Sequence, residues 1–317
     1  MRYLWLWVIV FVLAESAQTQ GSREATAASY LDRGNSWVTK GELDRAIADF
    51  NLALQFDPRF AGAYHNHAVA LAKKGKCNAA LADFDRAIQL DPRLAAAYVG
   101  RGEIRFRKGD LDGAMSDSTK AIELDPGLAE AWNNRGIARQ EKGDLDGALA
   151  DYDRSLQLNR KVSSTYTHRG RARYLKRDFD GAISDQTQAL KLNSVFAEAY
   201  GDRGAARCAK EDTQGALADF NRAIDLNPNL AKVYFSRALV FRKRGDFNQA
   251  LADYNRVIAL EPQYADAWAR RGLLKLRLGQ EAEAQEDFDH CLRLEPALKV
   301  SLEGLIRGER LQLAANP

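Results

Sequence analysis

Aromatic, small and charged positions recur along this chain with a period of 34 residues. When residues 27–298 are written in eight rows of 34, the fourth column is aromatic, the eighth is glycine or alanine, and the twentieth is alanine throughout. A fixed period of this length indicates that the chain stacks one supersecondary unit many times. The predicted units are residues 27–60, 61–94, 95–128, 129–162, 163–196, 197–230, 231–264 and 265–298.

Each row predicts two helices joined by a short turn. In the first part of a row, bulky and small residues are spaced three and four apart, as on one face of a helix. A glycine then follows in six rows, where it suits a left-handed helix cap: Gly41, Gly75, Gly109, Gly143, Gly245 and Gly279. The second helix ends before a proline in six rows, because proline cannot continue a helix: Pro58, Pro92, Pro126, Pro228, Pro262 and Pro296.

The eighth column predicts that the two helices of a row cross closely. Glycine inside a helix costs about 1 kcal/mol against alanine, so six glycines in this column need a packing reason. We expect the alanine column of the second helix to be the partner of these glycines.

These rows resemble the tetratricopeptide repeat over residues 27–298. Residues 129–162 carry the pattern of that family as Trp132, Gly136, Gly143, Ala148 and Tyr152, with Ser155 where alanine is usual. The resemblance implies an all-α fold, a right-handed superhelical solenoid of eight helix-turn-helix repeats. It also implies a concave groove that holds partner proteins.

The resemblance places the second, fifth, ninth and twelfth columns on the concave side of the solenoid. In the central rows these columns are mixed in charge and contain a few aromatics, which suits a peptide or a helix better than a polyanion. The candidate partner-binding residues are Val99, Glu103, Phe106, Asn133, Ile137, Gln140, Thr167, Arg171 and Tyr174. We therefore expect a non-enzymatic scaffold that binds a protein or peptide partner. A carbohydrate or cell-wall polymer bound by Phe106, Tyr174 and Phe235 is the alternative.

Two charged columns allow two interpretations. The seventh column is arginine in seven rows and His67 in the other, and the twenty-third is aspartate in all eight. They form either a ladder of ligand-binding groups or arginine–aspartate pairs that join helices. We favour the second interpretation, because the planar guanidinium group suits fixed pairs with carboxylates.

The eleventh column departs from the family in the central rows. Where the family has a large apolar residue, four rows carry Arg105, Arg139, Arg173 and Arg207. These arginines either shape the centre of the solenoid for an anionic partner, or lay their stems over the core and pair with the aspartate column. We favour the pairing.

The two ends of the chain differ from the repeats. Residues 3–13 are apolar and follow Arg2, and residues 14–17 are mostly small. This layout is typical of a secretory signal peptide, and eleven apolar residues are fewer than the about 20 that span a bilayer. We expect residues 1–17 to be a signal peptide, or else an uncleaved N-terminal anchor, and residues 18–26 to be a linker. The expected location is extracytoplasmic, in a bacterial periplasm.

Residues 299–317 are expected to form a capping helix and a tail. An apolar stripe runs along this segment, and it would cover the hydrophobic face that the last repeat exposes. The stripe consists of Val300, Leu302, Leu305, Ile306 and Leu313.

Composition excludes several classes of function. The formal net charge is +3, which is too balanced to predict nucleic-acid binding. Cys77, Cys208 and Cys291 stand in rows that do not touch in a solenoid, so no disulfide within the chain is expected. No catalytic or metal-binding motif stands out, so we expect no cofactor and no metal. The sequence indicates no oligomeric state.

Overall fold

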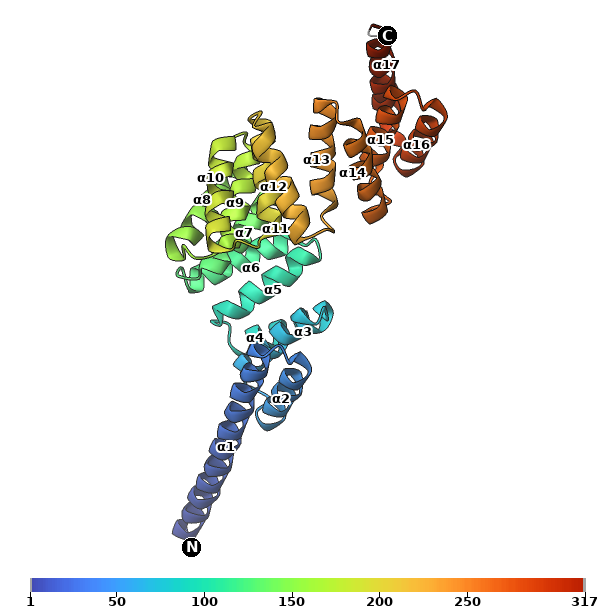
Figure 1. Cartoon of the computed structure of the whole chain (residues 1–317). Coiled ribbons are helices and arrows are strands. Elements are labelled where there is room, and N and C mark those ends of the chain that lie inside the picture. The colour runs from blue at the N-terminus through green and yellow to red at the C-terminus, as the bar shows by residue number, and fades with distance from the viewer. Residues whose placement is uncertain (1, 316–317) are drawn as a thin grey trace. The chain divides into compact units, whose positions relative to one another are not determined.

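The computed structural model describes residues 2–315, with side chains described for residues 20–314. Within this range the regular structure is helical throughout (Figure 1). The chain divides into two compact units, Met1–Arg160 and Lys161–Pro317.

The first unit contains four helical hairpins. The helices are α1 (Arg2–Thr39), α2 (Leu43–Phe56), α3 (Ala61–Lys73), α4 (Cys77–Leu90), α5 (Ala95–Arg107), α6 (Leu111–Leu124), α7 (Ala129–Glu141) and α8 (Leu145–Leu158). In each hairpin, the two helices of one row pack antiparallel, and within the unit α2 contacts α3, α4 contacts α5 and α6 contacts α7.

The second unit contains four further hairpins and a terminal helix. Each hairpin again contacts the next one along the chain. The helices are α9 (Ser163–Leu175), α10 (Phe179–Leu192), α11 (Ala197–Ala209), α12 (Thr213–Leu226), α13 (Ala231–Arg244), α14 (Phe247–Leu260), α15 (Ala265–Arg277), α16 (Glu281–Leu294) and α17 (Lys299–Ala315), with a short 3-10 helix at Pro296–Leu298.

Helix α1 is longer than a repeat requires. Residues 18–26 lie inside it rather than in the predicted linker. This segment contains no proline, and Gln20 donates a hydrogen bond to Glu24 one turn later, at 3.0 Å, so the helix of the first repeat continues through it. No helix among the described residues combines the length and the apolar character that a membrane crossing requires. The predicted export signal stays a prediction.

The turns inside the hairpins confirm the predicted left-handed caps. All six predicted glycines have φ between 75° and 84°. In two hairpins of the second unit the same position is Arg177 or Glu211, each with φ of 63°. The backbone therefore adopts the left-handed conformation even where the glycine that favours it is missing.

The glycines of the eighth column face a different partner from the one expected. A Cβ atom at Gly136 would lie 2.7 Å from the ring of Tyr152, and one at Gly204 would lie 2.7 Å from the ring of Phe220. The close approach is therefore mainly to the large side chain in the twenty-fourth column. The backbone of the alanine column also lies near in two hairpins, where the carbonyl oxygen of Ala284 is 3.1 Å from such a Cβ at Gly272 and that of Ala114 is 3.4 Å from one at Gly102.

The terminal helix covers the last repeat with part of the predicted stripe. Leu302 is buried against the α15–α16 hairpin and Ile306 packs beside it. Val300 is 81% exposed and Leu305 40% exposed, so the prediction is wrong for these two residues. A helix face repeats every three to four residues, and the face that begins at Leu302 continues through Glu309 rather than through Leu305.

Candidate partner-binding site

The arginine and aspartate columns form fixed pairs in the seven hairpins whose row carries the arginine, as the favoured interpretation predicted, and His67 pairs with Asp83 in the other. In the α5–α6 hairpin, Arg101 donates hydrogen bonds to both carboxylate oxygens of Asp117, at 2.9 and 2.6 Å. The same guanidinium reaches Asp85 of the preceding hairpin at 2.7 Å. The equivalent pairs are Arg33–Asp49, Arg135–Asp151, Arg169–Asp185, Arg203–Asp219, Arg237–Asp253 and Arg271–Asp287.

These pairs are architectural because their carboxylates are buried. The Asp117 and Asp151 side chains are each 2% exposed. The hydrogen bonds from Arg33 hold the pKa of Asp49 below its usual value. The carboxylates bind the chain's own guanidiniums, so the two columns are not a ligand ladder.

The eleventh-column arginines pair with the same carboxylates. Arg139 donates to Asp151 at 2.8 Å and to the carbonyl of Gly147 at 3.2 Å. The equivalent donors are Arg105 to Asp117, Arg173 to Asp185 and Arg207 to Asp219. The interpretation as packing and pairing groups is confirmed.

A short local motif accompanies each of these arginines. Asp144 caps α8 by accepting the backbone N–H of Gly147, and Arg139 lies beside both. A Cβ atom at Gly147 would overlap the Asp144 carboxylate. The same arginine, capping aspartate and glycine recur in the hairpins that begin with α5, α9 and α11.

A cavity of about 360 Å³ lies in the second unit, between α11 and α13 with Arg171 of α9 at its edge. Its lining combines acidic, basic and apolar groups, and most of them come from the first helices of hairpins. The lining residues are Arg171, Glu198, Gly201, Asp202, Ala205, Asn229, Leu230, Ala231, Lys232, Val233, Ser236 and Glu261.

An ion pair fixes the polar edge of this cavity. The Nε of Arg171 donates to Asp202 at 2.6 Å, and the Gln186 side-chain amide lies 3.5 Å from the same carboxylate oxygen. Burial raises the pKa of Asp202, and the Arg171 guanidinium works against that rise. The Asp202 side chain is still 29% exposed, so a donor group supplied by a ligand could reach its carboxylate.

Gly201 leaves room for the cavity. Seven of the eight residues in its column carry a side chain, from Leu31 to Ala269. A Cβ atom at Gly201 would lie 2.8 Å from Val233 of the next hairpin. The missing side chain thus lets Val233 of α13 approach α11 closely at the cavity wall.

The predicted groove residues of the first unit differ in accessibility. Glu103 is exposed and pairs with Arg107 at 3.0 Å, whereas Val99 packs beside the Tyr98 cluster. Gln140 accepts a hydrogen bond from the buried Tyr152 at 3.2 Å. The other predicted residues of this unit are half-buried: Phe106, Asn133 and Ile137.

In the second unit, one predicted residue lines the cavity and one is wrong. Arg171 is at the cavity edge, and Tyr174 is 38% exposed with its ring 5.4 Å from that of Phe179. Thr167 is 1% exposed and donates its hydroxyl to the carbonyl of Ser163 at 3.3 Å. It therefore cannot contact a partner, because its side chain is buried.

Sequence reasoning missed most of the cavity. Glu198, Asp202, Lys232 and Ser236 lie one and two repeats beyond the central rows in which the candidates were sought. The fifth-column glycine, Gly201, was the signal that could have pointed there.

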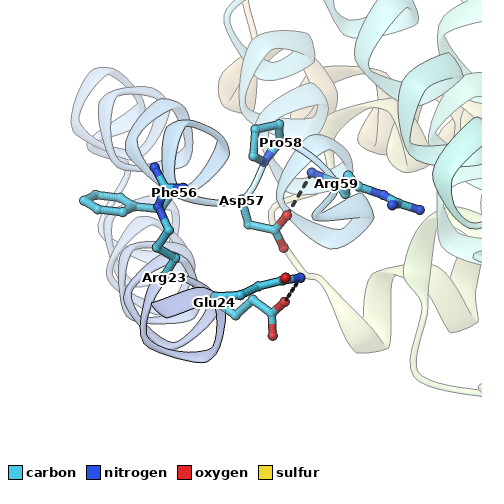
Figure 2. Close-up of a pocket in the computed structure, with 7 residues that line it drawn as sticks. Arg23, Glu24, Phe56, Asp57, Pro58 and Arg59 are labelled. Atoms are coloured by element: carbon cyan, nitrogen blue, oxygen red, sulfur yellow. Dashed lines mark hydrogen bonds between the residues drawn. The ribbon is translucent and has the colours of Figure 1, made fainter. Parts of the chain in front are cut away.

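A second cavity, of about 570 Å³, lies in the first unit beside α1 (Figure 2). Arg23 and Glu24 of α1 face the loop of Asp57, Pro58 and Arg59, where Asp57 accepts the backbone N–H of Arg59 at 2.9 Å. Its lining residues belong to none of the predicted groove columns. Among the side chains that the structure describes, no group of histidine, cysteine and acidic residues is placed to hold a metal ion.

Family models described as tetratricopeptide repeats match most of the chain. One covers residues 65–129 and 168–231, and others cover residues 129–162 and 265–298. A model described as a TPR repeat matches residues 238–279. No curated protein matches the sequence.

Solved structures of low sequence identity share the fold. The chain is similar to one in the APC/C hetero-tetramer Cut9–Hcn1, with 17% identity, a TM-score of 0.71, and coverage of 88% of this chain and 55% of that one. It is similar to PilF of Pseudomonas aeruginosa, with 19% identity, a TM-score of 0.60, and coverage of 67% and 96%. It is also similar to a tetratricopeptide repeat protein of Parabacteroides merdae, with 15% identity, a TM-score of 0.59, and coverage of 84% and 99%. This likeness shows the fold alone, an all-α solenoid of helical hairpins.

Proposed function

Because the chain belongs to the tetratricopeptide repeat family, whose members generally mediate protein–protein interactions, we propose that it is a non-enzymatic scaffold for a partner protein. An extended peptide or a helix of the partner binds across α11 and α13 of the second unit. The cavity of Arg171, Gly201 and Ser236 is the centre of that site.

One observation carries this proposal. The cavity has both signs of charge and an apolar wall within one helix-to-helix crevice. Lys232 can meet an acidic group of a peptide, Asp202 and Glu198 can meet a donor, and Val233 with Ala205 can meet an apolar side chain. Sites for peptides combine such apolar contact with a small number of placed polar groups.

The test fills the cavity. Peptides are selected from a random library on the wild-type protein, and their affinities are measured by fluorescence anisotropy. Ser236→Trp places a large ring in the half-buried cavity, so Kd should rise at least about tenfold. The matched control is Ser116→Trp, at an exposed position of α6 in the other unit.

Two outcomes count against the site. Equal Kd values for wild type and Ser236→Trp, with the melting temperature unchanged, would show that peptides bind elsewhere. Loss of affinity in Ser116→Trp would show that the effect is not specific to the cavity.

We also propose that residues 1–17 direct the protein out of the cytoplasm, into a bacterial periplasm. Arg2 and the apolar residues 3–13 support this location. The test fuses residues 1–30 to an alkaline phosphatase that is active only after export from a bacterial cell. Enzyme activity should appear with the natural segment and disappear when Val8 and Val12 are replaced by aspartate. A fusion that is inactive with the natural segment would reject the location.

A further inference from the structure

A third cavity, of about 500 Å³, lies along the same two helices as the proposed peptide site. It occurs where α11 and α13 end, and Arg277 of α15 completes it. Four of its lining residues are basic, and no acidic residue is among the described residues that line it. The lining consists of Cys208, Thr213, Leu239, Val240, Arg242, Lys243, Arg244 and Arg277, here called the basic pocket.

Three of the four cations have acidic partners at the rim. Arg244 pairs with Asp246 at 3.0 Å, and Lys243 lies 3.8 Å from Glu211. Arg277 binds Glu309 of the terminal helix.

The fourth cation, Arg242, is the one that lacks an acceptor. Its Nε is buried and has no hydrogen-bond partner among the described atoms. A buried donor without an acceptor is unfavourable, and more so when it is charged. An anionic group that entered the basic pocket would satisfy it, and could do so with a paired, charge-assisted geometry.

The repeat pattern explains why positive charge accumulates here. In three other hairpins the lysine in the fourteenth column reaches an acid of the hairpin before it: Lys74 reaches Asp44, Lys142 reaches Asp112 and Lys210 reaches Asp180. For Arg244 the equivalent residue is Gln214, which carries no charge, as Asn78 carries none opposite Lys108. At the Arg244 junction the acid is absent and three consecutive residues, 242–244, are basic.

We propose that the basic pocket binds the carboxylate of a glutamate or aspartate in the same partner peptide, with Arg242 as its main contact. This inference rests on the proposed function. Leu239 and Val240 give the pocket an apolar wall, which suits the methylene groups of an acidic side chain better than it suits a free inorganic anion.

The spacing of the two cavities sets the position of that acid. Val233 lines the cavity of the proposed peptide site, and Arg242 lines the basic pocket. The two residues are nine positions apart on one helix. At about 1.5 Å per residue they are about 14 Å apart along α13. An extended peptide covers about 3.3 Å per residue. The acidic residue of the peptide therefore lies about four residues from the peptide side chain that enters the cavity of the proposed peptide site.

The experiment uses fluorescein-labelled hexaglutamate at low ionic strength with the full chain. Arg242→Leu should weaken binding about tenfold or more. Arg222→Leu, which removes one arginine from an exposed position of α12, should change Kd less than about twofold. Arg242→Gln, which keeps a polar side chain, repeats the test, and unchanged melting temperatures show that both variants fold.

Several results would overturn the inference. The first is that hexaglutamate does not bind to the wild type, and the second is that wild type and Arg242→Leu bind it with equal affinity. The third is that inorganic phosphate competes at a lower concentration than unlabelled hexaglutamate does. If the selected peptides depend on Ser236 but hexaglutamate does not depend on Arg242, only this inference fails. If hexaglutamate depends on Arg242 while Ser236→Trp leaves the selected peptides unaffected, the proposed site fails and the basic pocket stands.

Discussion

Removal of one buried carboxylate, by Asp151→Ala, tests the role of the charged columns. Asp151 is 2% exposed and accepts three hydrogen bonds, two from Arg135 at 2.9 and 2.7 Å and one from Arg139 at 2.8 Å. The substitution leaves the guanidinium groups of Arg135 and Arg139, between α7 and α8, without this carboxylate partner.

The expected loss of stability comes from the two guanidinium groups, of Arg135 and Arg139, that lose this carboxylate as a partner. Removal of one partner from a buried ion pair costs about 3–5 kcal/mol. The Arg135 side chain is 13% exposed and the Arg139 side chain 26% exposed, so their guanidinium groups regain only part of their hydration. We therefore expect a loss near the lower end, about 3 kcal/mol.

A second substitution should recover part of that loss. Arg139→Leu restores the apolar residue that other rows have in this column, as in the α13–α14 hairpin, where Phe241 occupies the position and Arg237 pairs with Asp253. Arg139→Leu alone removes the hydrogen bonds to Asp151 and to the Gly147 carbonyl, but in the Asp151→Ala background it removes a charge that has already lost its buried partner. The double variant should therefore be more stable than Asp151→Ala by about 1 kcal/mol or more.

The assay must report on this hairpin, because a repeat array can unfold in parts. Hydrogen exchange of peptides that cover α7 and α8 should accelerate about 10²-fold in Asp151→Ala. Urea unfolding followed by circular dichroism gives the global loss. Glu141→Ala, at an exposed end of α7, is the control and should change stability by less than about 0.5 kcal/mol. If Asp151→Ala behaves like this control, or if Arg139→Leu destabilises both backgrounds equally, the charged columns do not hold the hairpins together.

Two further substitutions test the second unit. Arg177→Gly with Glu211→Gly should raise stability by about 1 kcal/mol, because both residues have a left-handed backbone that costs more for side-chain residues than for glycine; an unchanged or lower melting temperature would show that this backbone is not strained. Burial, helped by Arg171, lowers the pKa of His168 to about 4 from 6.5, so the unfolded chain binds a proton that the folded protein does not. The stability that this difference supplies is complete above pH 6.5 and is lost as the pH falls towards 4. His168→Gln should flatten the pH dependence of the melting temperature over that range, and a variant with the same slope as the wild type would contradict the assignment.

The period of the sequence predicted the hairpins well because it records local packing. The glycine turns and the arginine–aspartate pairs recur at the same columns in both units, so the residues of one row predict the contacts of another. Periodicity was less informative where a property depends on which atoms meet. It identified Gly136 as a point of close approach but named the alanine column, whereas the ring of Tyr152 fills that space.

The period of the sequence did not predict the structure of residues 18–26 or which groove candidates are accessible. Residues 18–26 looked like a linker because they are polar, yet nothing in them stops a helix that the first repeat already nucleates. Thr167 shares a column with groove residues, but its side chain is buried. Burial depends on how the helices pack in three dimensions, which the letters of a single row do not contain.

Two departures from the period lie at the crevice between α11 and α13. Gly201 lacks a side chain that its column otherwise has, and Arg242 carries a charge where its column has none elsewhere. Gly201 lines the cavity of the proposed peptide site, and Arg242 lines the basic pocket. A residue that repeats in every row is explained by the repeat, because the same contact recurs. A residue that breaks the pattern needs a cause of its own, and the proposed binding of a partner at this crevice would supply one cause for both.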